Sequence, residues 1–322
     1  MHAPPLADCW FLTGPTASGK TSAGIELARR IGAEIASLDS MAVYRGLDIG
    51  TAKPTPEERQ AVAHHLIDLI DPDQEFSLAE YLEAAQKAAA DIAARGREVL
   101  FVGGTPLYLK ALLRGIFEGP PADWELRRRL QSEAREHGPD WLHARLAAVD
   151  PVAASRLHAN DARRLIRALE VFEKTGRPIS VWQQQFERAR PAEACKVFVL
   201  DWPRETLYAR IDARVEQMFA AGLVAEVEAV LNAGKNFGRT ARQALGYRET
   251  LEFLEGRRSL DETIELVKTR TRQFAKRQLT WFRSLSECRW IAMDESLSPA
   301  DVAEQILQHF QNGRYTHPRP RT

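Results

Sequence analysis

Short apolar runs alternate with longer amphipathic stretches along most of the chain. Strand-like runs lie at residues 9–12, 34–38, 65–70, 98–102, 196–200 and 289–293, and stretches with helical periodicity separate them. This alternation is typical of an α/β fold in which a parallel sheet is flanked by helices. Ligands of such sheets bind at the carboxyl ends of the strands, so we expect the functional residues there.

The strand signal disappears at residues 123–190, where only helices are predicted. Asp123, Asp150 and Asp161 are suitable helix N-caps, and Gly176 suits the end of a helix. We therefore predict a helical insertion domain over these residues.

The catalytic core is then discontinuous and comprises residues 1–122 and 191–311. Its second part is expected to contain long helices at residues 205–233 and 260–285. Residues 312–322 are rich in Arg and Pro, and we expect a disordered tail.

Composition is that of an ordinary globular protein, with 44% hydrophobic and 27% charged residues among 322. No apolar run is long enough to cross a membrane, and residues 1–8 do not resemble a secretory signal. The three cysteines are scattered without metal-binding spacing. We expect a reduced, cytoplasmic protein without a membrane partner.

Charge is balanced overall, with 44 basic and 44 acidic residues, but residues 268–283 contain six basic residues and no acidic one. Lys268, Arg272 and Lys276 recur every fourth residue and should share one helix face. The buried stripe of the same helix is expected at Phe274, Trp281 and Leu285. Such a face suits phosphate backbones, and a merely solvated helix surface is the alternative.

Residues 14–21 read GPTASGKT and fit the phosphate-binding pattern G-x-x-x-x-G-K-[ST] at every defined position. The glycines allow backbone N–H groups to face a phosphate at the start of a helix. Lys20 would contact the outer phosphate oxygens, and the Thr21 hydroxyl would hold Mg²⁺. An ordinary Gly-rich turn is the alternative.

Further polar residues follow other strand-like runs. Asp39 and Ser40 follow one run, where they would act on a substrate or metal or merely cap the next element. Thr105 follows a Gly-Gly pair, with Pro106 suited to the first position of a helix. Asp201 imitates the Mg²⁺-binding aspartate of nucleotide hydrolases, a role for which Asp39 competes.

Several segments, taken in order and at their spacing, closely resemble tRNA dimethylallyltransferases of the bacterial type. They are GPTASGKT (14–21), Asp39-Ser40 with Tyr44, DIGTAKP (48–54), HHLID (64–68), GGTPLY (103–108), Asn160-Asp161 with Arg163, Arg164 and Arg167, RQALGY (242–247) and KRQLTWF (276–282). The resemblance covers nearly the whole chain except its two ends. It implies a P-loop NTPase-like fold with a helical insertion domain.

The resemblance also implies a reaction. The family transfers a dimethylallyl group from dimethylallyl pyrophosphate to N6 of the adenine immediately 3′ of the anticodon, in tRNAs reading codons that begin with U. Asp39 matches the general base, Thr105 a hydrogen-bonding residue beside the reacting groups, and Lys20 a stabiliser of the leaving diphosphate. The remaining diphosphate contacts by resemblance are Gly14, Thr16, Ala17, Ser18, Gly19, Thr21 and Arg214, with Arg210 as a rival to Arg214.

Contacts with the tRNA anticodon stem-loop follow from the same resemblance. They fall on Asp39, Ser40, Met41, Ala42, Thr105, Arg127, Arg163, Arg164, Arg167, Arg242, Gly246, Tyr247, Lys276, Arg277 and Trp281. The adenine must leave the stacked loop to reach Asp39. One departure from the family is Pro106, where Gly is usual, and we expect little effect on Thr105.

Other functions share some of these features. A P-loop small-molecule kinase would have the same loop, Mg²⁺ and parallel sheet, but a nucleoside triphosphate as donor. A prenyltransferase acting on free adenine nucleotides would not need the basic helix or the insertion. A tRNA-binding protein without catalysis would not need Lys20, Thr21, Asp39 and Thr105. We expect a monomer.

Overall fold

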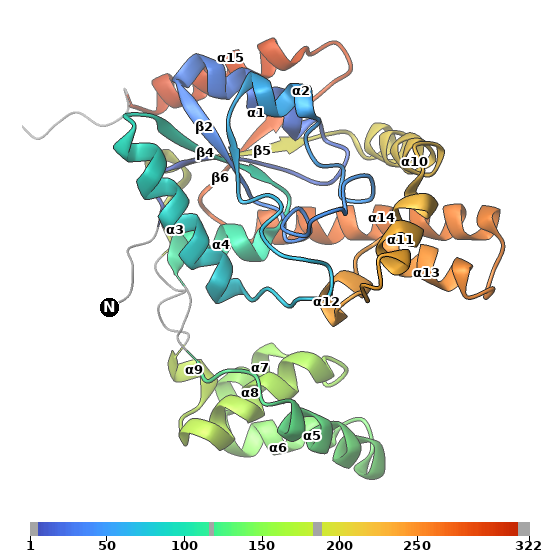
Figure 1. Cartoon of the computed structure of the whole chain (residues 1–322). Helices are drawn as coiled ribbons and strands as arrows, with labels where there is room; N and C mark the ends of the chain where they lie inside the picture. Colours follow the sequence, from blue (N-terminus) through green and yellow to red (C-terminus); the bar gives the residue numbers. More distant parts are fainter. Residues whose placement is uncertain (1–5, 116–118, 183–188, 315–322) are drawn as a thin grey trace, which may run out of the picture. The chain divides into compact units, whose positions relative to one another are not determined.

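The computed structural model describes residues 6–115, 119–182 and 189–314, and within these residues one parallel sheet forms the core (Figure 1). Its strands are β1 (Trp10–Thr13), β2 (Ala33–Ser37), β3 (His64–His65), β4 (Glu98–Gly103), β5 (Lys196–Asp201) and β6 (Cys288–Ala292). Their order is β3-β2-β4-β1-β5-β6, and every adjacent pair is parallel. The predicted α/β class is confirmed.

Helices cover both faces of this sheet, with α1 and α15 on one face and α3 and α4 on the other (Figure 1). The helices of this unit are α1 (Lys20–Ile31), α2 (Pro56–Ala61), α3 (Leu78–Ala94), α4 (Pro106–Arg114), α10 (Arg204–Ala220), α11 (Leu223–Asn232), α12 (Arg239–Arg242), α13 (Tyr247–Leu254), α14 (Leu260–Arg283) and α15 (Pro299–Arg314). Neighbouring residues of β1 point to opposite faces of the sheet: Leu12 packs against α1 in one apolar core, and Phe11 packs against α3 and α4 in the other. Both faces are buried, as parallel sheets require.

Residues 114–188 form a separate unit with their own apolar core, which includes Leu130, Leu146 and Leu169. The helices of this unit are α5 (Trp124–His137), α6 (Trp141–Val149), α7 (Pro151–Arg156), α8 (Ala162–Thr175) and α9 (Ile179–Trp182). The predicted caps at Asp123, Asp150 and Asp161 each accept a backbone N–H, and Gly176 ends α8 in the left-handed conformation, so these local predictions are confirmed. Among the described residues of both units, no helix is long and apolar enough to span a membrane.

Two secondary-structure predictions were wrong because the backbone turns where the side-chain pattern continues. The strand expected at residues 65–70 is only His64–His65, because Leu66 and Asp68 adopt positive φ angles of 63° and 58°. The single helix expected at residues 205–233 is broken into α10 and α11 at Gly222, whose φ is 100°.

The expected buried stripe of α14 also needs correction. Phe274 is 37% exposed and Trp281 is half-buried, whereas the side that faces the protein carries Thr263, Val267, Thr271, Ala275, Gln278 and Phe282. Polar residues in this buried face hid it from the hydrophobic pattern. At the end of the chain, α15 continues to Arg314, so residues 312–314 are helical, and the rest of the predicted tail lies outside the described residues.

Candidate functional site

The loops that follow β1, β2 and β4 meet at one edge of the sheet. β4 lies between β1 and β2, so the phosphate loop, Asp39 and Thr105 all emerge from adjacent strands. The ends of β2 and β4 are especially close: a Cβ on Gly103 would lie 2.3 Å from the carbonyl oxygen of Leu38. Only glycine fits there, which explains one of the two glycines before Thr105.

The phosphate loop has the bent backbone that the motif requires. Ala17 and Gly19 have φ angles of 61° and 85°, and α1 begins directly afterwards at Lys20. Donors from the segment after β5 hold the loop: Trp202 Nε1 donates to the Ser18 carbonyl at 3.0 Å, and Arg210 Nε donates to the Ala17 carbonyl at 3.0 Å. The loop conformation is therefore supported by the protein itself.

Lys20 lies half-buried at the centre of this loop. Its Nζ donates to the carbonyl of Pro15 at 2.6 Å. The pKa of Lys20 is lowered to about 7, mainly by burial and also by the positive charge of Arg214, while the negative charge of Asp39 opposes both effects. A lysine with this pKa gains its proton readily when an anion arrives.

Arg214 of α10 contributes a second, half-buried cation. Its Nε has no hydrogen-bond partner among the described residues. Burial lowers the pKa of Arg214, and the negative charge of Asp39 opposes the shift. A buried N–H donor without an acceptor is costly, so the arrangement favours an anionic ligand beside this nitrogen.

Asp39 and Thr105 are held together by backbone contacts. The N–H of Met41 donates to Asp39 Oδ1 at 2.8 Å. The N–H of Ser40 donates to Thr105 Oγ1 at 3.1 Å, and the N–H of Thr105 donates to the carbonyl oxygen of Leu38 at 3.1 Å. Since Thr105 Oγ1 accepts from Ser40, its own proton remains available to another acceptor.

Two residues without an assigned role proved to organise this region. Gln278 of α14 bridges the phosphate loop and Gly104. Glu226 of α11 accepts hydrogen bonds from the N–H groups of residues 48–50 and from the Tyr247 hydroxyl. Both roles depend on contacts between distant segments, which a single sequence does not reveal. For Gln278 the available signal was its place in the family-like segment KRQLTWF (276–282), and for Glu226 there was none.

The predicted tRNA contacts fall into distinct environments. In the sheet-containing unit, Lys276 and Arg277 are exposed, Ser40 and Met41 are half-buried, and Ala42 is buried. Arg242 is exposed and pairs with Glu255 at 2.8 Å. Gly246 and Tyr247, at the start of α13, are both buried. Tyr247 has no exposed surface, so its side chain is not accessible to RNA here, although a tRNA contact was expected for it.

Two further cations of α14 are engaged within the protein. Lys268 pairs with Glu216 at 2.7 Å, and Arg272 pairs with Asp212 at 2.6 Å. Both partners belong to α10, so these charges stabilise the packing of α10 on α14. Of the expected face of Lys268, Arg272 and Lys276, only Lys276 is exposed and has no ion pair among the described residues, and the exposed Arg277 follows it in the chain.

In the helical unit, Arg163 and Arg164 are exposed, whereas Arg127 and Arg167 both donate to Glu170. The Glu170 carboxylate has no exposed side-chain surface, and it also accepts the N–H of Asp123 at 2.7 Å. Arg127 and Arg167 thus stabilise the junction of α5 and α8.

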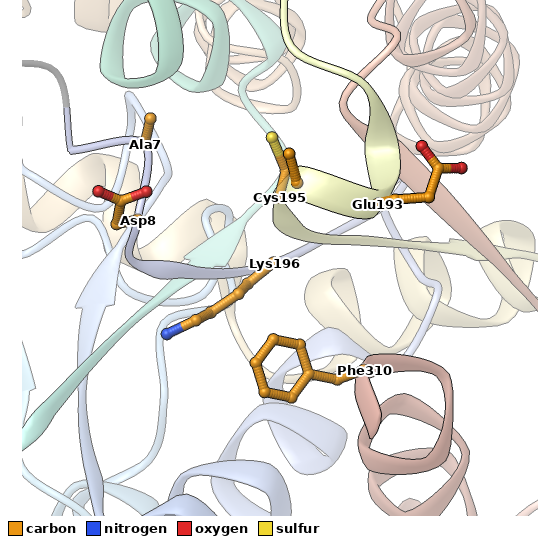
Figure 2. Close-up of a pocket in the computed structure, with 7 residues that line it drawn as sticks. Ala7, Asp8, Glu193, Cys195, Lys196 and Phe310 are labelled. Carbon is orange, nitrogen blue, oxygen red and sulfur yellow. The ribbon is translucent and has the colours of Figure 1, made fainter. Parts of the chain in front are cut away.

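A cavity of about 210 Å³ lies at the opposite edge of the sheet (Figure 2). It is lined by Ala7, Asp8, Glu193, Ala194, Cys195, Lys196 and Phe310. Lys196 begins β5, so this edge is the amino-terminal one. None of the predicted site residues lines the cavity.

Comparison with known proteins gives consistent results. The family model described as IPP transferase matches residues 42–285. A tRNA dimethylallyltransferase of Geobacter metallireducens is 51% identical over 281 residues, covering 87% of this chain and 91% of the relative. One from Rhodopirellula baltica is 47% identical over 312 residues, covering 94% and 93%.

Solved structures give the same result. The tRNA isopentenylpyrophosphate transferase of Bacillus halodurans is 36% identical with a TM-score of 0.68, covering 96% of this chain and 98% of that protein. A eukaryotic dimethylallyltransferase acting on tRNA is 26% identical with a TM-score of 0.75, covering 98% and 81%. These similarities span both described units of the chain.

Proposed function

The chain belongs to the IPP transferase family of tRNA dimethylallyltransferases, and from this premise we propose that it transfers a dimethylallyl group from dimethylallyl pyrophosphate to N6 of the adenine immediately 3′ of the anticodon, in tRNAs reading codons that begin with U. The products are N6-dimethylallyladenosine and pyrophosphate. We further propose a cytoplasmic monomer, since the substrates are a small diphosphate and tRNA.

One observation carries the proposal: Lys20, Arg214 and Asp39 interact electrostatically within one site at the carboxyl edge of the sheet. The two cations suit a diphosphate, which leaves with negative charge. The carboxylate suits a group that must lose a proton.

The reaction then divides between these residues. The allylic C–O bond breaks, and its electron pair leaves with the diphosphate, whose charge Lys20 and Arg214 stabilise. N6 of adenine forms the new C–N bond and releases a proton, which Asp39 accepts. The free proton of Thr105 Oγ1 is directed to the oxygen that bridged carbon and phosphorus.

Mg²⁺ fits this site as a partner of the diphosphate. Thr21 offers one hydroxyl oxygen in the first turn of α1, and within the described residues no group of three His, Cys, Asp or Glu side chains could hold a metal without the substrate. Such a donor set matches Mg²⁺, which is usually bound by few protein ligands plus phosphate oxygens. When bound, the ion would supply further neutralisation of the leaving group. A role for Asp201 is not needed.

Recognition of tRNA is assigned to exposed cations. Lys276 and Arg277 in the sheet-containing unit, and Arg163 and Arg164 in the helical unit, are accessible to phosphates. The target adenine is extruded from the anticodon loop so that it reaches Asp39.

The decisive experiment supplies labelled dimethylallyl pyrophosphate with either total tRNA or adenosine monophosphate. Label in tRNA, located by nuclease digestion at the adenine 3′ of the anticodon, supports the proposal. Label only in the mononucleotide would assign the protein to free nucleotides. Transfer from a γ-labelled nucleoside triphosphate, with none from the isoprenoid, would establish a kinase.

A further inference from the structure

Gln278 lies in the middle of α14, yet only 4% of its surface is exposed. Its Oε1 accepts a hydrogen bond from the N–H of Thr16 at 3.0 Å, and its Nε2 donates to the carbonyl of Gly104 at 2.5 Å. One carboxamide therefore joins the phosphate loop to the residue immediately before Thr105.

The chemistry of these contacts requires an amide. A peptide N–H only donates and a peptide carbonyl only accepts, so the two partners fix which end of the carboxamide faces which loop. An ionised glutamate would keep the acceptor and lose the donor. A methionine would fill similar space and lose both hydrogen bonds.

The space around the amide is also restricted. A Cβ on Gly104 would lie 2.7 Å from Gln278 Nε2 and 3.7 Å from Lys20 Nζ. The close approach of Gln278 therefore depends on a glycine at this position, and it occurs beside the catalytic lysine.

We propose that Gln278 is a positioning residue, which sets the separation between the phosphate loop and the Thr105 turn for prenyl transfer. This inference rests on the proposed function. Bond breaking at the diphosphate and bond formation at N6 involve opposite sides of one carbon, so both loops must be held in register. Displacement by about 1 Å can cost about 10²-fold in rate.

The Gln278→Glu variant gives a readout that a purely structural role would not produce. Near pH 8 the carboxylate cannot donate to Gly104 and places a negative charge near Lys20, so kcat should fall about 10- to 100-fold. Protonation restores the donor and removes the charge. The ratio of variant to wild-type kcat should therefore rise at least about fivefold as the pH is lowered to about 6.

The ratio is used because Lys20, whose pKa is about 7, lies in the same site in both proteins, where the charges of Arg214 and Asp39 also act on it. Gln273→Glu is the matched control: Gln273 is exposed on the same helix, and its variant carries the same added charge. Its ratio to wild type should not change with pH. A pH-independent ratio for Gln278→Glu would overturn the inference.

Gln278→Met removes both hydrogen bonds without adding charge. We expect a similar loss of kcat at any pH, with an unchanged KM for tRNA and a cooperative melting transition. If this variant does not fold, Gly104→Ala provides a second test, because its methyl group displaces the amide from the other side and should cause the same loss of kcat. Adding Gln278→Ala to the Gly104→Ala variant should then cause no further loss of kcat. Additive losses, or full activity of Gln278→Met, would refute the positioning role. Inactivity of the wild-type protein with tRNA would instead refute the proposed function.

Discussion

The ammonium of Lys20 and the guanidinium of Arg214 lie in one half-buried site, where the charge of Arg214 helps to lower the pKa of Lys20 to about 7. Two positive charges at such a site repel each other, and a bound anion offsets this repulsion. The free protein therefore keeps Lys20 largely neutral above neutral pH, and a bound diphosphate makes its charged form favourable.

Binding of dimethylallyl pyrophosphate should consequently take up a proton on Lys20. At about pH 8 the free lysine is mostly neutral and the bound one charged, so we expect uptake of about 0.5 to 1 proton, which declines as the pH falls below about 7. Isothermal titration calorimetry in buffers of different ionisation enthalpy measures this number. Lys20→Met should abolish the uptake, and an equal uptake by that variant would assign the proton to another group.

Asp39→Asn should separate chemistry from binding. The Asn side-chain oxygen can still accept the N–H of Met41, but the amide cannot remove a proton from N6. We expect the single-turnover rate of transfer to fall by about 10² to 10⁴. Affinity for tRNA, measured by filter binding, should change little, and a parallel loss of affinity would contradict the base role.

The exposed cations of α14 should differ from its paired ones. Lys276→Ala and Arg277→Ala should each weaken binding to all tRNAs and reduce the slope of log affinity against log salt by about 1. Arg272→Ala should leave that slope nearly unchanged, because Arg272 already pairs with Asp212. Titrations at several salt concentrations test this, and equal slopes for all three variants would show that pairing does not decide which cation contacts RNA.

Glu226→Gln should destabilise the loop after Asp39 more than Tyr247→Phe does. The carboxylate accepts from three backbone N–H groups and from Tyr247, and an amide group satisfies fewer of these donors. We expect losses of about 1 to 3 kcal/mol for Glu226→Gln and about 1 kcal/mol for Tyr247→Phe. Urea unfolding measures both, and the reverse order would mean that Tyr247 is held mainly by packing.

Sequence patterns predicted those parts of the fold that local chemistry determines. Five strand-like runs correspond to β1, β2, β4, β5 and β6, and the caps at Asp123, Asp150 and Asp161 begin the expected helices. The phosphate loop, Asp39 and Thr105 were placed at one edge because each follows a parallel strand. These predictions needed only periodicity, helix capping and the rule that ligands bind at the carboxyl ends of parallel strands.

Other features depend on contacts between segments far apart in the chain, and such contacts produce no periodic pattern of hydrophobic residues in the sequence. The turn at Leu66 and Asp68 has side chains that continue an apolar alternation, while its backbone adopts positive φ. Gln278 is buried because two distant main-chain groups need its amide. Hydrophobic patterning therefore assigned α14 the wrong buried face.

The shared carboxylate of Glu170 affects how the helical unit must be studied. Removing either Arg127 or Arg167 takes away one of the two cationic partners of this buried carboxylate, and the resulting loss of stability would lower apparent RNA affinity whether or not that arginine touches RNA. Among the four arginines predicted to contact tRNA in this unit, Arg163 and Arg164 are exposed and do not pair with Glu170, so their alanine variants report more directly on the ligand.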